Sequence, residues 1–344
     1  MLTSSEHPTL EQLLAIPPRI TPITPADQGL FTRMFLAELE LERYPNSWAY
    51  MTQACRGLGK LGYKYDDGRV LISIGVHKEH YVVVNPLGRY AGAVVNDIVR
   101  HLHHWSGKPV FIKHIKENDR QQLGAGYIGM AEYPWESDAP FDDATYPEVV
   151  IHHRSLEHID TQVNVKYRLR LNRFLNHLAS IAHDHLGIEH YDLFKHGEGV
   201  QALFERWADG DATRLEPYRN MLEHPPASGF SLVSCLLTTQ VLGFHVFDRV
   251  GIHTAAVYAN ITDHRRIPGS SEACFLMAMA ELEYHNITSI NLGGSETVSL
   301  DAWKRKLNPH TLRDTRPDHL VYIGDSLPAQ SVEAPTAHPP SPQR

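Results

Sequence analysis

The spacing of apolar and polar residues predicts a mixture of helices and strands in the first part of the chain. Short apolar runs bounded by turn residues are typical of strands, whereas apolar residues at intervals of three and four are typical of helices. Gly107 is a natural stop for the helix that precedes it. The pattern predicts two helices, three strands, a helix and a strand, in that order, over residues 26–45, 47–58, 60–67, 69–78, 80–88, 91–107 and 108–115.

The second part of the chain repeats this order of strands, helix and strand. The segment between the two parts, 127–147, is acidic, aromatic and Pro-bearing, and is typical of a linker. No repeat is visible residue by residue, yet the order of elements indicates two copies of one mixed α/β unit. The predicted strands and helices cover 148–153, 159–187, 199–210, 229–238, 240–251, 252–262, 268–287 and 289–294.

These patterns divide the chain into four parts. We expect an N-terminal arm at 1–25, which is Pro-rich, followed by a first domain at 26–148 and a second domain at 149–326. The remaining residues, 327–344, are rich in Pro and Ser and are predicted to be disordered.

Composition is ordinary for a globular protein. The 344 residues are 42% hydrophobic and 21% charged, with a net charge of −8, which argues against non-specific nucleic-acid binding by the whole surface but leaves room for a local basic patch. Three cysteines, Cys55, Cys235 and Cys274, are predicted to be reduced thiols. No apolar run reaches the roughly 20 residues of a membrane span, and no signal peptide is recognised, so a cytoplasmic protein is expected.

Histidine is abundant, with 23 residues, and raises the question of a metal site. The densest groups are His101, His103 and His104, and then His183 and His185. Neither group accompanies an H-E-x-x-H or CxxC pattern, and both lie in helical text where histidines can occupy a polar face. The sequence therefore predicts no metal.

The strand at 289–294 ends in Gly293 and Gly294, and a cationic segment follows it. Ligands of open α/β sheets bind at the carboxyl ends of strands, so this turn is expected beside an active site. Lys304, Arg305 and Lys306 follow Trp303 directly. Asn291, Gly293, Gly294, Glu296 and Trp303 are the residues predicted to line the substrate pocket.

A second basic cluster lies on the predicted helix at 159–187. Lys166, Arg170 and Arg173 fall at i, i+4 and i+7 and share one face, while Tyr167, Leu171 and Phe174 share the adjoining face. The first cluster continues with Arg313 and Arg316. Each cluster alone is compatible with solvated side chains on a helix surface. Two clusters on either side of one predicted cleft favour phosphate binding.

The loop at 266–271 indicates a different anion site. Arg266, Gly269 and Ser271 nearly match the R/Q-x-x-G-x-G/A loop with which GNAT acyltransferases hold the pyrophosphate of coenzyme A. Ser271 replaces the usual Gly or Ala, and the adjacent acidic Glu272 would compete with a phosphate. The other interpretation is a helix N-cap formed by Ser270 or Ser271.

Residues 268–309 resemble the end of the catalytic domain of lysyl-phosphatidylglycerol synthases and their soluble relatives. The family's L-x-x-F-K-x-x-F segment has its counterpart in Leu300-x-x-Trp303-Lys304-x-x-Leu307, with Trp and Leu in place of the two Phe residues. The run KYRLRLNRF at 166–174 is similar to the family's basic helix, and the order of elements agrees over 26–325.

This resemblance implies two tandem GNAT-like domains, each a mixed sheet flanked by helices. It implies an aminoacyltransferase that takes its amino acid, seryl being one candidate, from aminoacyl-tRNA without a further cofactor. The chain lacks the membrane domain of lipid-modifying members and is more similar to soluble ones, such as the seryl transferase of valanimycin biosynthesis. The acceptor is then a small amine, hydroxylamine or hydroxyl compound, in natural-product biosynthesis.

The resemblance also implies roles for single residues. Lys304 would stabilise the tetrahedral oxyanion or assist departure of the ribose oxygen. Trp303 would stack on the terminal adenine, or anchor the core. Glu296 and Asp301 are the nearest candidates for a general base, or are ion-pair partners of the cations. Contacts to acceptor-stem phosphates would come from Lys166, Arg170, Arg173, Arg305, Lys306 and Arg313.

Three alternatives to this function stay open. The chain would be an acyl-CoA-dependent N-acyltransferase if the loop at 266–271 binds coenzyme A. It would modify phosphatidylglycerol from aminoacyl-tRNA if the acceptor is a lipid, or it would be a binding module that keeps the fold without the reaction.

Overall fold

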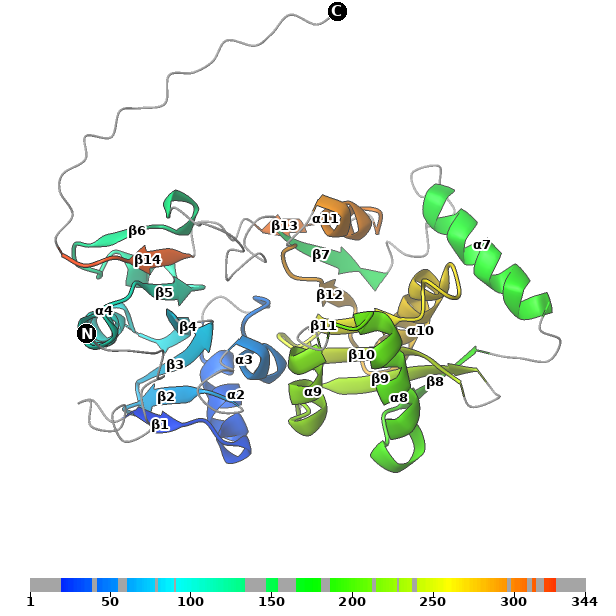
Figure 1. Cartoon of the computed structure of the whole chain (residues 1–344), viewed down its shortest axis with the longest axis horizontal. Coiled ribbons are helices and arrows are strands. Elements are labelled where there is room, and N and C mark those ends of the chain that lie inside the picture. Colours follow the sequence, from blue (N-terminus) through cyan, green and yellow to red (C-terminus); the bar gives the residue numbers. More distant parts are fainter. Residues whose placement is uncertain are drawn as a thin grey trace, which may run out of the picture.

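The computed structural model consists of two β-sheets side by side, each flanked by helices (Figure 1). It has the mixed α/β fold class expected from the sequence. The residues that the structure describes are 20–38, 42–54, 61–77, 80–89, 91–133, 147–153, 165–180, 186–211, 215–227, 229–236, 240–295, 298–307, 311–313 and 319–325. The predicted tail at 327–344 and most of the predicted arm lie outside these residues.

The first sheet has seven strands in the order β1-β2-β3-β4-β5-β14-β6. All neighbours are antiparallel except β4 and β5, which are parallel and joined through helix α4. Two further helices, α2 (Gln28–Leu36) and α3 (Trp48–Ala54), cover the opposite face from α4 (Ala91–Ser106). The strands are β1 Ile20–Pro22, β2 Tyr63–Asp66, β3 Val70–His77, β4 His80–Gly88, β5 Val110–Lys113, β14 Leu320–Tyr322 and β6 Tyr127–Gly129.

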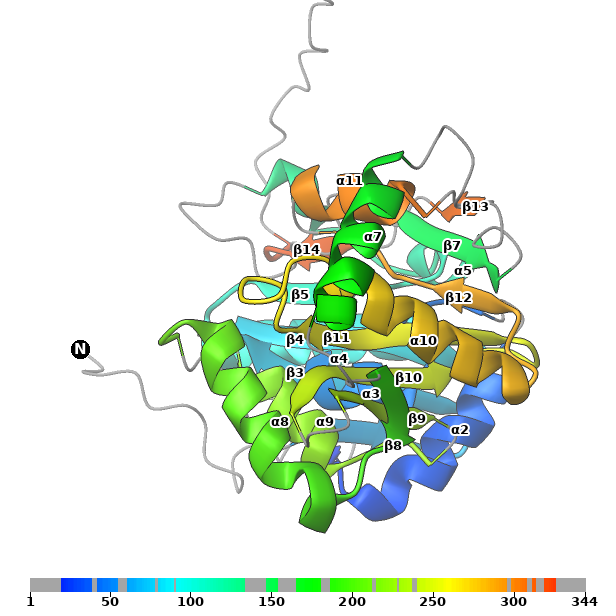
Figure 2. The same ribbon diagram turned by 90° about the vertical axis from the view of Figure 1, so that its right-hand side faces the viewer.

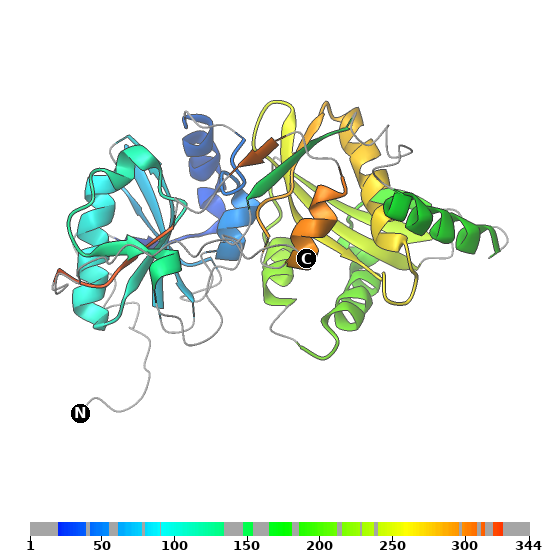
Figure 3. The ribbon, with the colours of Figure 1, turned by 90° about the horizontal axis from the view of Figure 1, so that it is seen from above.

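Alternation along the strands explains why helices lie on both faces of this sheet. In β4, Val83 packs in the cluster under α4, whereas Val82 and Val84 point to the other side. Successive side chains of a strand point to opposite faces of the sheet. A strand that is apolar throughout therefore needs a layer of helices on each face. Figure 3 shows α4 on the outer side of the first sheet and α3 on the side that faces the second.

The second sheet has seven strands in the order β13-β7-β12-β11-β10-β9-β8. Its parallel pair is β11 and β12, joined through α10. Helices α8 and α9 pack on the face that α10 leaves open. The elements are β7 Glu148–His152, α7 Val165–Ser180, β8 Leu186–His190, α8 Leu193–Ala208, α9 Glu216–Glu223, β9 Phe230–Leu236, β10 Val241–Arg249, β11 Thr254–Thr262, α10 Ser270–Tyr284, β12 Ser289–Asn291, α11 Val298–Arg305 and β13 Thr311–Arg313.

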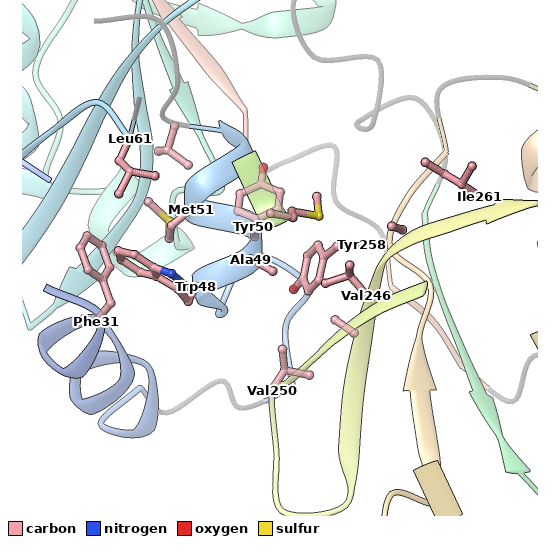
Figure 4. Packing of buried hydrophobic residues seen from close by; sticks show 14 of the residues in the cluster. Phe31, Trp48, Ala49, Tyr50, Met51, Leu61, Val246, Val250, Tyr258 and Ile261 are labelled. Atoms are coloured by element: carbon pink, nitrogen blue, oxygen red, sulfur yellow. The ribbon is translucent and has the colours of Figure 1, made fainter. Parts of the chain in front are cut away.

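One hydrophobic cluster extends across both units. Phe31 and Trp48 of the first unit share it with Val246 and Val250 of the second, and Tyr258 lies between them (Figure 4). The two units therefore bury a common core, in the manner of one large domain rather than of two domains on a linker.

A polar contact fixes the same junction. The carboxylate of Asp248, on β10, accepts hydrogen bonds from the backbone N–H groups of Trp48 at 3.0 Å and of Ala49 at 3.3 Å. These N–H groups open helix α3 and have no partner within the helix, so a residue of the second unit caps a helix of the first.

The two sheets have the same topology, and each has one strand inserted out of chain order between two antiparallel neighbours. In the first sheet β14 lies between β5 and β6, and in the second β7 lies between β12 and β13, all antiparallel. The sequence placed 320–322 in the second domain, but this strand completes the first sheet. The predicted linker and arm likewise contribute strands, β6 and β1.

Most predicted elements are present, with two corrections. The helix predicted at 26–45 ends at Leu36, and the described residues 42–45 are not helical. The helix predicted at 159–187 is α7 followed by strand β8, whose backbone pairs with β9 along Leu186–His190, so tertiary pairing overrides the helical pattern there. The helix predicted at 47–58 is described only to Ala54. Among the described residues, no helix combines the length and apolar character that crossing a bilayer requires.

Candidate functional site

The candidate site lies where the parallel strands β11 and β12 separate. Their pairing ends with Ala256 opposite Asn291, after which β12 gives way to the turn at Gly293 and Gly294. Gly293 has φ 67°, a left-handed conformation that favours glycine. A Cβ atom built on it would lie 2.7 Å from Cε2 of Tyr44, so the turn also requires a glycine for close packing.

Lys304 reaches back from α11 to this turn. Its side chain is buried, with 6% exposure, and its Nζ donates hydrogen bonds to the carbonyl oxygen of Gly293, at 3.2 Å, and to that of Gly294. A lysine on the helix that follows the turn can reach it because α11 begins only a few residues later. The predicted neighbourhood of Lys304, Gly293 and Gly294 is thus present, and its catalytic role stays a prediction.

Asn291 connects the turn with both units. Its Nδ2 donates to the carbonyl oxygen of Glu42 and to Oε2 of Glu148, each at 3.0 Å, and its Oδ1 accepts from the N–H of Gly293 at 2.9 Å. Asn291 is fully buried and Glu148 is 2% exposed. Such a network orders the groups around it because each buried polar atom would otherwise lose its hydrogen bonds to water.

Tyr44 of the first unit contacts both β11 and the turn that follows β12. The Tyr44 hydroxyl donates to the carbonyl oxygen of Val257 at 2.8 Å, and the Tyr258 hydroxyl donates to the carbonyl oxygen of Tyr44. The rings of Tyr44 and Tyr258 are 4.7 Å apart. Neither Tyr44 nor Glu148 is recognisable from the sequence, because each acts on residues far away along the chain.

A matching polar region lies where β4 and β5 separate in the first unit. Asn85 and His114, which follow the last paired residues, both have positive φ, 43° and 59°. His114 is buried, and within the described part of the chain neither of its ring nitrogens has a hydrogen-bond partner. Burial, followed by the charges of His319, Lys113 and Arg43, holds the pKa of His114 well below its usual range.

The remaining cations of the α11 segment are more exposed than Lys304. Arg305 is exposed and donates from Nε to Asp301 at 2.6 Å, while Asp301 itself is buried. Lys306 is partly exposed, and its contact with phosphate stays a prediction. The backbone of Arg313 lies in β13, and its side chain is outside the described residues, as are Glu296 and Arg316.

Trp303 packs into the core of the second unit. Its ring lies 5.8 Å from that of Phe275 in an edge-on arrangement, within the cluster between the sheet and α10. Of the two roles expected for this residue, the structure supports the anchor. Stacking on a base stays a prediction.

Helix α7 exposes two of its predicted cations and buries two of the aromatic residues of the adjoining face, although Val165, Leu169 and Leu175 of the same helix are exposed. Tyr167 and Phe174 are buried, whereas Arg170 and Arg173 are exposed. Lys166 lies in α7, but its side chain is outside the described residues. Figure 2 shows α7 across the beginning of α10.

This packing occupies the loop that resembles a coenzyme A site. Gly269, with φ 90°, is the N-cap of α10. The expectation that Ser270 or Ser271 takes this position is therefore wrong. A Cβ atom on Gly269 would lie 2.2 Å from the carbonyl oxygen of Arg170. Glu272 is buried beside it and pairs with the Arg170 guanidinium at 3.0 Å. A backbone carbonyl and a carboxylate at this helix N-terminus are unfavourable for a pyrophosphate.

Comparisons with known proteins place these features in a structural context. No family model matches the chain, and no curated protein matches its sequence. Among solved structures, a conserved protein of unknown function from Bacteroides thetaiotaomicron is similar, with a TM-score of 0.63 and 13% identity over 88% of this chain and 98% of that one.

Two further structures carry descriptions of an activity. The C-terminal domain of a protein described as a lysylphosphatidylglycerol synthetase, from Agrobacterium fabrum, has a TM-score of 0.55 and 13% identity over 88% of this chain and 92% of that one. The L-PGS of Bacillus licheniformis has a TM-score of 0.52 and 15% identity over 77% and 83% of the two chains. At these identities the likeness shows the fold, which is the one expected from the resemblance.

Proposed function

We propose that this protein transfers an amino acid from aminoacyl-tRNA to a small amine, hydroxylamine or hydroxyl acceptor, with a role in natural-product biosynthesis. The observation that carries the proposal is the buried ammonium of Lys304 at the turn that ends β12. The likeness in fold to the L-PGS of Bacillus licheniformis supports it.

The proposed reaction needs alignment and charge stabilisation more than a strong base, because an aminoacyl ester is already activated. The acceptor's nucleophilic atom attacks the ester carbonyl, the carbonyl oxygen becomes an oxyanion, and the ribose oxygen then leaves and takes up a proton that the acceptor gives up. The Lys304 ammonium would stabilise the negative charge. Removing one donor of this kind reduces rates about 10²–10³-fold.

The donor tRNA would be held through its phosphates. Arg170 and Arg173 on α7, and Arg305 and Lys306 at α11, present exposed or partly exposed cations. Contacts of this kind bind the backbone without sequence readout and weaken as salt rises. Lys166 and Arg313 belong to the same proposed surface.

Transfer to phosphatidylglycerol is the second candidate. It is favoured by the likeness to the domain described as a lysylphosphatidylglycerol synthetase. The coenzyme A alternative loses support from the carboxylate of Glu272 and the packing of α7 at the N-terminus of α10.

The test is a discharge assay. The full chain is incubated with radiolabelled aminoacyl-tRNAs, seryl-tRNA first, and with a panel of small amines, hydroxylamines and phosphatidylglycerol vesicles. RNase-sensitive transfer to a small acceptor is the expected result, and transfer to the vesicles alone would identify the second candidate. Consumption of acetyl-CoA without any tRNA discharge would refute both.

Variants assign the role of Lys304. Lys304→Ala should reduce transfer about 10²–10³-fold, whereas Lys108→Ala, a substitution next to β5 in the first unit, should leave it unchanged. Lys304→Arg keeps the positive charge but changes the shape of the charged group. Partial activity in this variant would therefore support a role for charge. Equal rates for wild type and Lys304→Ala would remove Lys304 from the mechanism.

A further inference from the structure

Three potential metal ligands converge at the end of the second unit opposite to Gly293. His190 ends the edge strand β8, Glu281 lies in the last turn of α10, and His285 follows that helix as its C-cap. One ligand atom of each residue lies within 4.8 Å of the other two. None of the three belongs to the histidine groups that stand out in the sequence.

The geometry points to a site for one divalent transition-metal ion of the zinc type, bound by His190, Glu281 and His285. Nε2 of His285 and Nε2 of His190 lie 3.6 Å and 3.8 Å from Oε1 of Glu281. Ligands on a tetrahedral zinc at bond lengths of about 2.0–2.1 Å are separated by about 3.4 Å. Small rotations of the three side chains bring them onto one ion.

Two of the ligands, one in the last turn of α10 and one at its C-cap, have a spacing suited to a shared ion. Glu281 and His285 are four residues apart, so their side chains lie on the same face one turn apart. The third, His190, belongs to a strand on which α10 packs. Two imidazoles and one carboxylate also form a ligand set that zinc accepts, with a fourth position left for water.

Surrounding contacts hold the histidines in place before any ion binds. The His285 ring packs on Phe230 at 4.6 Å, and its backbone carbonyl accepts a hydrogen bond from Arg249 at 2.9 Å. The His190 ring lies 6.4 Å from the same Phe230 ring. Ordered ligands lose less conformational entropy on binding, which favours affinity.

The ion would link the edge strand β8 to helix α10. Among the strands that the structure describes, β8 is the last of its sheet and pairs only with β9. An ion shared with α10 would hold it against the helix. Because this end of the sheet is remote from the turn at Gly293, we assign the ion a stabilising role and no part in the proposed transfer.

The competing explanation is a pair of ordinary histidine–carboxylate contacts, and metal titration separates the two. The full chain, without an affinity tag, is stripped with a chelator and titrated with Co²⁺, whose visible spectrum reports its ligands, and then with Zn²⁺ in competition. We expect one site, with binding at least about tenfold weaker in each of His190→Ala, Glu281→Gln and His285→Ala.

The matched control is His104→Ala, which removes an exposed histidine from the densest group in the sequence. This variant should bind Co²⁺ like wild type, and Zn²⁺ should raise the melting temperature of both but not of the three ligand variants. All variants should melt like wild type in chelator, which shows that they fold. Equal binding by wild type and ligand variants, or no binding at micromolar metal, would overturn the proposal.

Discussion

Replacing Asn291 by alanine tests whether its hydrogen bonds hold the two units and the Gly293 turn together. The substitution removes two donated hydrogen bonds, to Glu42 and Glu148, and one accepted from Gly293, all in a fully buried place. A neutral hydrogen bond contributes about 1 kcal/mol and one to a charged group about 1.5–3 kcal/mol. The sum predicts a loss of about 4 kcal/mol, a large part of the 5–15 kcal/mol typical of a folded protein.

The assay is urea unfolding followed by tryptophan fluorescence, which includes the signal of Trp48 in the core shared by both units. The expected result for Asn291→Ala is a large fall in the midpoint, measured against Asn118→Ala, which changes an exposed asparagine and should alter stability by less than about 0.5 kcal/mol. A midpoint for Asn291→Ala within the range of this control would refute the reasoning.

A second variant distinguishes lost hydrogen bonds from lost volume. Asn291→Asp keeps an acceptor for the N–H of Gly293 but places a carboxylate against Glu148, which lies 3.0 Å from the present Nδ2. Two adjacent carboxylates share a proton more readily as pH falls. The deficit of Asn291→Asp should therefore be larger at pH 7 than at pH 5, whereas that of Asn291→Ala should change little.

Three further predictions concern other buried positions. Burial lowers the pKa of His245 to about 4, from 6.5 in the unfolded chain. The unfolded state therefore takes up a proton first as pH falls, so the free energy of unfolding should drop by about 3 kcal/mol between pH 6.5 and pH 4. In acid unfolding, His245→Gln should show a smaller drop. Gly293→Ala should cost at least about 1–2 kcal/mol in urea unfolding, because of its left-handed φ and the Tyr44 ring. Asp248→Ala should cost about 1–2 kcal/mol through loss of the α3 cap, and Asp248→Asn less.

The neighbourhood of Lys304 could be predicted from the sequence because it depends on local order. A strand, a Gly-Gly turn and a short helix follow one another within 289–305, so the turn and the lysine meet whatever the rest of the chain does. The cationic and aromatic positions of α7 are local in the same sense, since helical spacing alone separates Arg173 from Tyr167. Periodicity within one element is the strongest signal that a single sequence carries.

The polar groups around the turn could not be predicted, because they come from other parts of the fold. Tyr44 reaches Val257 only when the two units pack together, and Glu148 reaches Asn291 only when β7 pairs with β12. The surface histidines show the same limit. His190 and His285 are far apart in the sequence, while the conspicuous run at 101–104 supplies no ligand set among the described residues.

The positions of β14 and β7 explain why the predicted second domain, 149–326, includes a strand of the first sheet. Each of these strands lies between two antiparallel neighbours, at the same position in the two equivalent sheets. Along the chain, β7 follows β6 of the first sheet, and β14 follows β13 of the second. The local pattern of Leu320–Tyr322 specifies a strand in either case. Pairing with β5 places Val321 in the core shared by both units, so the choice of sheet is made by tertiary packing. Strand β14 thereby returns the chain to the first sheet after the strands from β7 to β13 have formed the second.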